Sequence, residues 1–110
     1  MIDWKRRGPR RALSCAVLCA ALAASAAPDG FREMMDEATA RMHAAMHVPY
    51  TGDPDRDFAR MMIPHHQGAI DMAMVELRYG KDERLKRLAQ EIIVTQKQEI
   101  QVMNLVLGAH

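Results

Sequence analysis

The sequence predicts an all-α protein, a small antiparallel bundle of three helices that follows an N-terminal segment of different composition. Apolar residues recur every three or four positions along three stretches, which is the period of a helix face. Clusters of Pro, Gly and Asp separate these stretches, and no stretch carries the alternating pattern of a strand. The length of 110 residues leaves room for one small domain.

The N-terminal segment, residues 1–26, has the order of a secretory signal peptide. Lys and Arg are concentrated before residue 12, an apolar run extends from Ala12 to Ala24, and Ala24-Ser25-Ala26 offers small residues for cleavage. The apolar run is too short to span a bilayer as a helix. We therefore expect export to the periplasm and a mature domain of residues 27–110 that contains no membrane span.

Removal of this segment changes the chemistry of the chain. It takes five of the 15 Lys and Arg and one of the 14 Asp and Glu, which leaves a mildly acidic domain without a basic patch for nucleic acid. It also takes every Cys and Ser, so the mature domain has neither thiolate ligands nor the usual nucleophiles, and we expect no enzyme. Nine of the ten Met and all five His remain.

The first two helices are separated by a loop rich in Pro and Gly. We expect the first helix over roughly 31–47, with Asp29 as its N-terminal cap. Asp53 or Asp55 is expected to cap the second helix, which should continue to about Tyr79. Pro64 falls inside this helix and removes a backbone hydrogen bond, which predicts a kink.

The third helix is expected from Asp82 to about Leu107, followed by Gly108. The short link after Tyr79 predicts that the last two helices form an antiparallel hairpin. Three helices of unequal length give a thin core, and a homodimer that completes a four-helix or larger bundle would remedy this.

Methionine and histidine recur together in the first two predicted helices. Side chains three and four positions apart share a helix face, so one helix can present thioether and imidazole groups to a single ion. Four of the five His follow a Met by one or four positions. The candidate ligands by this spacing are Met42, His43, Met46 and His47 in the first helix, and Met61, Met62, His65, His66 and Met72 in the second.

The softness of these ligands indicates which ion they suit. Thioethers are soft and uncharged, and they bind copper(I) rather than Mg²⁺ or Ca²⁺. Structural zinc sites normally use Cys, which the mature domain lacks. We therefore expect copper(I), with silver(I) as its chemical mimic. Methionine also fills irregular cores, and we prefer this interpretation for Met35 and Met74, while His43 and His47 can equally form a solvated helix flank.

The third predicted helix carries two polar residues, Gln96 and Glu99, on its otherwise apolar face. A buried carboxylate needs a partner. Glu99 can hydrogen-bond a histidine ring and fix which ring nitrogen faces a metal, or it can pair with an arginine such as Arg60.

Three stretches of the chain resemble a large bacterial family. They are Met62-Ile63-Pro64-His65-His66-Gln67-Gly68-Ala69-Ile70-Asp71-Met72-Ala73, Leu88-Ala89, and Gln96-Lys97-Gln98-Glu99-Ile100-Gln101-Val102-Met103, together with Asp57-Phe58. The sequence is similar to CopM-like periplasmic copper-binding proteins over about residues 53–107. That resemblance implies a ferritin-like helical bundle that binds copper(I) and silver(I). It also implies ligand roles for Met62, His65, His66, Met72 and Met103.

These observations predict a non-enzymatic copper(I)-binding protein that buffers, sequesters or ferries the ion outside the cytoplasm. One alternative is a structural or adaptor bundle whose Met face binds partner helices without tight metal binding. A ferritin-like metal oxidase is a weaker alternative, because its two-metal centre uses Glu-x-x-His motifs and no Glu here is followed by His three positions later.

Overall fold

The computed structural model describes residues 30–108, and these form three helices. They are α1 (Phe31–Met46), α2 (Pro54–Tyr79) and α3 (Glu83–Leu107). The predicted all-α class is confirmed, and each helix begins and ends close to its expected bounds. The expected signal peptide, residues 1–26, and the expected cap Asp29 lie outside the described residues.

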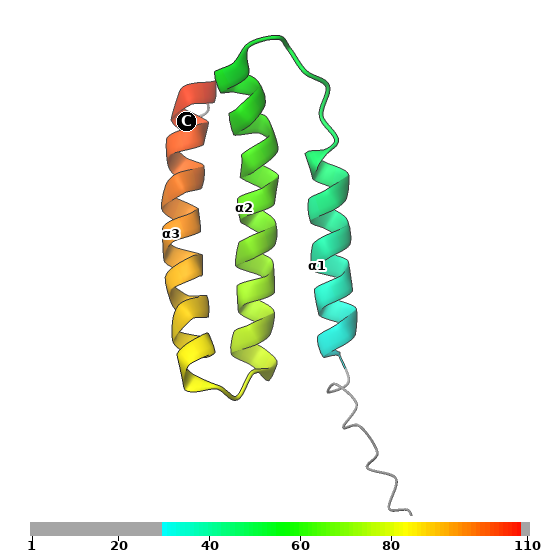
Figure 1. Ribbon diagram of the computed structural model, residues 1–110, viewed down its shortest axis with the longest axis vertical. Coiled ribbons are helices and arrows are strands. Elements are labelled where there is room, and N and C mark those ends of the chain that lie inside the picture. The colour runs from blue at the N-terminus through cyan, green and yellow to red at the C-terminus, as the bar shows by residue number, and fades with distance from the viewer. Residues whose placement is uncertain (1–29, 109–110) are drawn as a thin grey trace, which may run out of the picture.

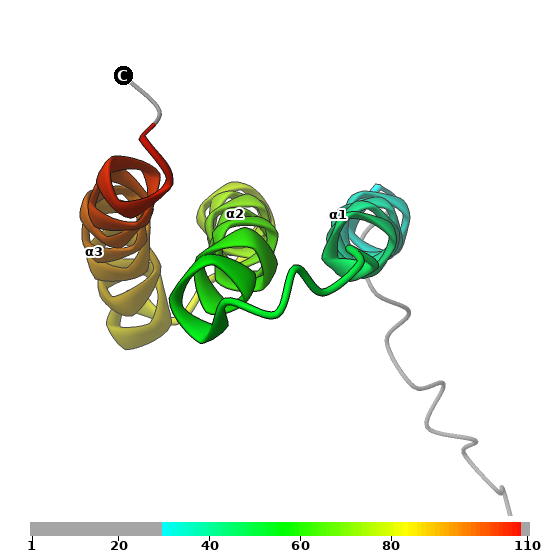
Figure 2. The ribbon, with the colours of Figure 1, turned by 90° about the horizontal axis from the view of Figure 1, so that it is seen from above.

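The three helices form a single layer in which α2 lies between α1 and α3 (Figures 1 and 2). Neighbouring helices run antiparallel, and the link between α2 and α3 makes them the predicted hairpin (Figure 1). Within residues 30–108, α1 packs only on α2 and makes no contact with α3. The core therefore consists of two seams, one between α1 and α2 and one between α2 and α3, and each helix keeps a face that no other helix covers.

The helix ends agree with the chemistry of their capping residues. The Asp53 carboxylate accepts hydrogen bonds from the backbone N–H groups of Asp55 and Arg56, which decides between the two expected caps of α2. Asp82 caps α3 in the same way, as predicted. Gly30 precedes α1 with a φ of 90°, a left-handed conformation that glycine adopts without strain. α2 continues through Pro64 as one helix.

The seam between α1 and α2 depends on Gly68 in the middle of α2. A Cβ atom at this position would overlap Sδ of Met42 and lie 2.6 Å from its Cγ and 2.8 Å from its Cβ. The absence of a side chain therefore lets Met42 lie directly on the α2 backbone, while Ala38 is buried one turn earlier in α1. At the other end of this seam, the rings of Phe31 and Tyr79 pack edge to face with centroids 6.1 Å apart.

The seam between α2 and α3 runs along the two longer helices. Ile70 and Ala73 of α2 and Ala89 and Met103 of α3 are buried in it. Met74, which we expected to fill the core, is 57% exposed, and that prediction is wrong. Helical spacing alone did not show that Met74 points away from both neighbouring helices. No helix in residues 30–108 is long and apolar enough to cross a membrane.

Candidate metal centre

A pocket of about 460 Å³ lies where the end of α1, the following loop and the first turns of α2 meet. Four of the predicted ligands line it, three from the end of α1 and one from α2. Val48 and Tyr50 of the loop complete the wall. The four ligand side chains are His43, Met46, His47 and Met61.

The loop beside this pocket is held by hydrogen bonds to α2. The Asp57 carboxylate accepts from the backbone N–H and the hydroxyl of Thr51, at 2.8 and 2.7 Å, and from the N–H of Gly52 at 3.0 Å. These hydrogen bonds from Thr51 lower the pKa of Asp57 below its ordinary value of 3.8, with Gly52 and the Arg60 charge contributing further. Arg60 also donates to the carbonyl oxygen of Pro49 at 3.3 Å. The pocket wall is therefore anchored to the helix that supplies Met61.

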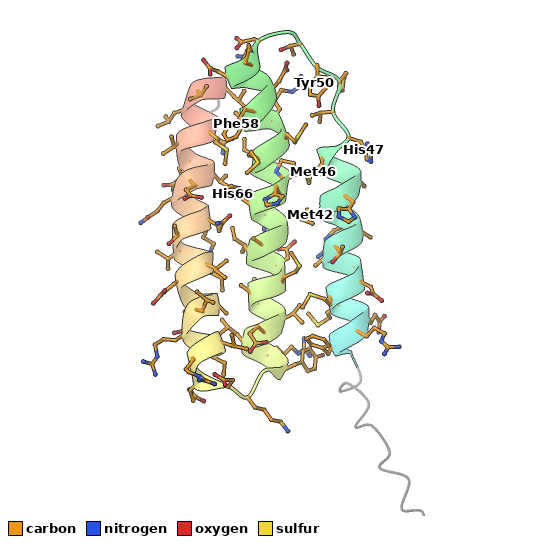
Figure 3. The ribbon with its side chains drawn as sticks, viewed as in Figure 1. Met42, Met46, His47, Tyr50, Phe58 and His66 are labelled. Atoms are coloured by element: carbon orange, nitrogen blue, oxygen red, sulfur yellow. The ribbon has the colours of Figure 1, made fainter. Side chains whose placement is uncertain are left out.

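The donor set of this pocket is two thioethers and two imidazoles. Met46 and Met42 lie on the side of α1 that faces α2, and His47 lies where the helix ends (Figure 3). His43 and His47 are exposed to solvent, whereas Met46 and Met61 are partly buried. All four groups are uncharged when a metal binds them, and the two sulfur atoms are soft donors. The pocket thus offers the mixture of ligands that suits copper(I) better than a hard cation.

His66 makes a different arrangement in the seam between α2 and α3. Its Nε2 atom lies 2.6 Å from Oε2 of Glu99, and its side chain is 12% exposed. Of the two partners that the sequence left open for Glu99, the structure shows the histidine, while Arg60 donates to the Pro49 carbonyl oxygen in the loop. Glu99 itself is 50% exposed and is not the buried carboxylate that the sequence suggested. The adjacent His65 is exposed, with its ring centroid 6.0 Å from that of His66.

The remaining candidates do not share the pocket at the end of α1. Met72 lies on an apolar groove of about 320 Å³ between α2 and α3, and the Thr39 hydroxyl is 4.0 Å from its sulfur. It is seven residues from His65, or about 10 Å along the helix, so the two residues lie two turns apart. Met42 is packed on Gly68, and Met103 is buried in α3. Met62 lies one turn before His66.

Histidine and carboxylate side chains form no metal-binding cluster by themselves in the described part of the chain. Within residues 30–108, no group of three or more His, Cys, Asp or Glu side chains is close enough to hold a metal ion. Two wall residues, Val48 and Tyr50, were missed by the sequence analysis, because they lie in a loop whose position depends on the Asp57 and Arg60 contacts.

The fold and the pocket define the class of protein. It is a small all-α protein in which two Met and two His side chains line a pocket at the joint between two helices. The chain belongs to the family described as "Domain of unknown function (DUF305)", whose model matches residues 7–107.

One relative adds a local likeness. "Uncharacterized protein L153" of Acanthamoeba polyphaga mimivirus is 43% identical over 53 residues. The matched stretch covers 48% of this chain and 35% of the viral protein, so the likeness spans about a third of that relative.

Proposed function

We propose that this protein is an exported, non-enzymatic copper(I)-binding protein that buffers or ferries the ion outside the cytoplasm. The observation that carries the proposal is the pocket lined by His43, Met46, His47 and Met61. Two soft sulfurs and two imidazoles from one pocket match copper(I) chemistry, and within residues 30–108 no group of three or more His, Cys, Asp or Glu side chains is placed to hold a metal ion. The resemblance to CopM-like periplasmic proteins agrees with this assignment, and the order of residues 1–26 agrees with export.

Copper(I) titration against a coloured chelator tests the proposal. The full chain is used with Cys15→Ser and Cys19→Ser, so that thiolates do not compete for the ion. We expect copper(I) and silver(I) to bind far more tightly than zinc, because thioethers supply half of the pocket's ligands. Equal affinity for zinc and copper(I), or no copper(I) uptake, would contradict the proposal.

Substitution of the pocket methionines shows whether this pocket is the site. Met46→Leu with Met61→Leu removes both thioethers at nearly constant volume, so the fold should be retained. We expect the copper(I) affinity of the pocket to fall about tenfold or more, since even outer-shell ligand partners are worth that much. Met74→Leu is the matched control, because Met74 is exposed on α2 away from the pocket. A similar affinity for both variants would place the copper elsewhere.

We further propose that two chains pair through an uncovered stripe on α3. The stripe has seven positions, which are spaced alternately by three and four residues along α3. Five of them are apolar, namely Leu85, Leu88, Ile92, Val102 and Val106, and the other two are Thr95 and Glu99. This is the spacing by which a helix packs along a partner helix. Leu88 and Val102 are 48% and 61% exposed, although both are apolar. A second copy would cover the stripe and complete the bundle that the single layer leaves open.

Sedimentation velocity over a range of concentrations tests this pairing. Leu88→Glu places a charge in the stripe and should keep the chain monomeric. Leu105→Glu is the matched control, because Leu105 is also an exposed leucine, at 66%, but lies off the stripe on the same helix. A monomeric wild type, or loss of the dimer in both variants, would argue instead for an adaptor surface or a nonspecific effect.

A further inference from the structure

The contact between His66 and Glu99 leaves one atom of the seam between α2 and α3 without a partner. His66 Nε2 is paired with Glu99 at 2.6 Å, whereas Nδ1 of the same ring is buried and makes no hydrogen bond. Among residues 30–108, it is the only buried side-chain nitrogen or oxygen without a hydrogen-bond partner. Burying a polar atom without a partner costs about 1–3 kcal/mol, so its position calls for an explanation.

The contact with Glu99 determines which nitrogen of the neutral His66 ring carries the proton. A carboxylate only accepts hydrogen bonds, so Nε2 carries the hydrogen that lies between His66 and Glu99. Nδ1 then holds a lone pair that points into the protein rather than toward the carboxylate. A lone pair on neutral imidazole is the form in which histidine binds a metal ion.

The antiparallel register brings thioethers to the same part of the seam. Met62 lies one turn before His66 in α2, and Met103 lies one turn after Glu99 in α3. Because the helices run in opposite directions, these two steps lead to the same level of the hairpin. Side chains on a helix lean toward its N-terminus, so the His66 ring leans toward the turn that carries Met62. Met62 is partly buried and Met103 is buried.

We propose that Glu99 is a positioning residue that holds the Nε2–H of His66, so that Nδ1 is the ring nitrogen that binds copper(I) beside Met62 and Met103. This site is distinct from the pocket at the end of α1, and its copper chemistry rests on the proposed function. Glu99 does not touch the ion. It fixes the tautomer and the orientation of the ring, a role that outer-shell carboxylates perform for histidine ligands.

Nitrogen NMR tests the tautomer directly and needs no metal. The full chain with Cys15→Ser and Cys19→Ser is labelled with ¹⁵N, and long-range ¹H–¹⁵N spectra distinguish the two ring nitrogens. We expect metal-free His66 to carry its proton on Nε2, and copper(I) or silver(I) to shift the Nδ1 resonance. A proton on Nδ1 in the metal-free chain, or a metal-dependent shift at Nε2 instead, would overturn the proposal.

Two substitutions at Glu99 then distinguish a positioning role for its carboxylate from a general effect on folding. Glu99→Leu removes the acceptor and should release the tautomer preference, with copper(I) affinity at this site lowered about 10–100-fold. Glu99→Gln keeps an oxygen acceptor and should retain most of the preference and of the affinity. Glu91→Leu is the control, because Glu91 is exposed on the same helix and lies two turns from Glu99. Circular dichroism verifies that each variant remains helical.

The outcomes distinguish this inference from the proposed function. If the chain with intact Glu99 takes up no copper(I), the copper chemistry of both sites fails together, whatever the tautomer. If that chain binds copper(I) while Glu99→Leu keeps the same affinity and the same His66 spectrum, the positioning role alone is overturned. A drop in affinity that Glu99→Gln rescues, accompanied by a change of tautomer only in Glu99→Leu, supports it.

Discussion

The two seams of the layer are built differently. The seam between α2 and α3 joins two long helices through a tight link, and it buries Ile70, Ala89 and Met103. The seam between α1 and α2 joins a shorter helix through a longer loop, and Ala38 is the buried residue of α1. Because α1 is the shortest helix and, within residues 30–108, packs on α2 alone, α1 should separate from α2 more easily than the hairpin opens. The pocket with two Met and two His therefore lies at the weaker joint, and the His66–Glu99 pair lies in the stronger one.

The largest expected effect comes from a cavity in the stronger seam. Ile70→Ala removes a side chain that is 2% exposed and should lower the free energy of unfolding by about 2–5 kcal/mol. Thermal unfolding followed by circular dichroism should show a single transition at lower temperature, because all three helices depend on the hairpin. Val94→Ala, at an exposed position of α3, should change stability by no more than about 0.5 kcal/mol. Equal effects would mean that the hairpin does not dominate stability.

A smaller effect is expected when the weaker seam is forced apart. Gly68→Ala favours the helix but places a methyl group against Met42, and overpacking of this kind costs about 1–3 kcal/mol. Hydrogen exchange should show faster exchange of the α1 amides, while amides around Ala89 in α3 keep their protection. Met42→Ala in the same chain removes two of the three overlapping atoms and should restore part of the protection. Uniform loss of protection in all three helices would contradict the difference between the seams.

Acid should weaken two loop anchors by a smaller amount. The pKa of Asp82 lies below its ordinary value of 3.8, because its carboxylate accepts hydrogen bonds from the Arg84 side chain and from the backbone N–H groups of Leu85 and Arg84. Hydrogen bonds from Thr51 lower the pKa of Asp57 in the same way. A lowered folded-state pKa gives stability that is present above the unfolded value and is lost as pH falls through the folded value. Asp82→Asn should therefore differ from the wild type above about pH 4 and converge with it in stronger acid. Denaturant titrations at several pH values measure this, and a constant difference would exclude the carboxylate charge as the cause.

The helices themselves could be predicted because their signals are local. Asp53 and Asp82 offer their carboxylates to the N–H groups of the first turn, and the period of apolar residues marks the helix interiors. These features depend on a few neighbouring residues. The partner of Glu99 was left open between a histidine and Arg60, and the carboxylate is half exposed rather than buried, so its contact with His66 could not be predicted from the helix pattern alone.

The assembly of the pocket could not be predicted, because spacing along one helix does not specify which helices meet. The spacing grouped Met61 with His65, yet Met61 shares its pocket with residues of α1. Gly68 is the sequence feature that indicates this contact, because an isolated glycine inside a long helix often marks the close approach of another chain segment. Met42 occupies that place, so its sulfur packs on α2 instead of lining the pocket.

The position of the pocket at the end of α1 has an electrostatic consequence. The peptide dipoles of a helix sum to about half a negative charge at its C-terminus, which favours a nearby cation by about 0.3–1 kcal/mol. His43 and Met46 belong to the last turn of α1 and line the pocket, whereas Met61 lies well inside α2, beyond the reach of the positive end of that helix. A cation held by four neutral side chains would thus be balanced by the backbone of α1, and no acidic ligand would be needed that also attracts calcium or magnesium.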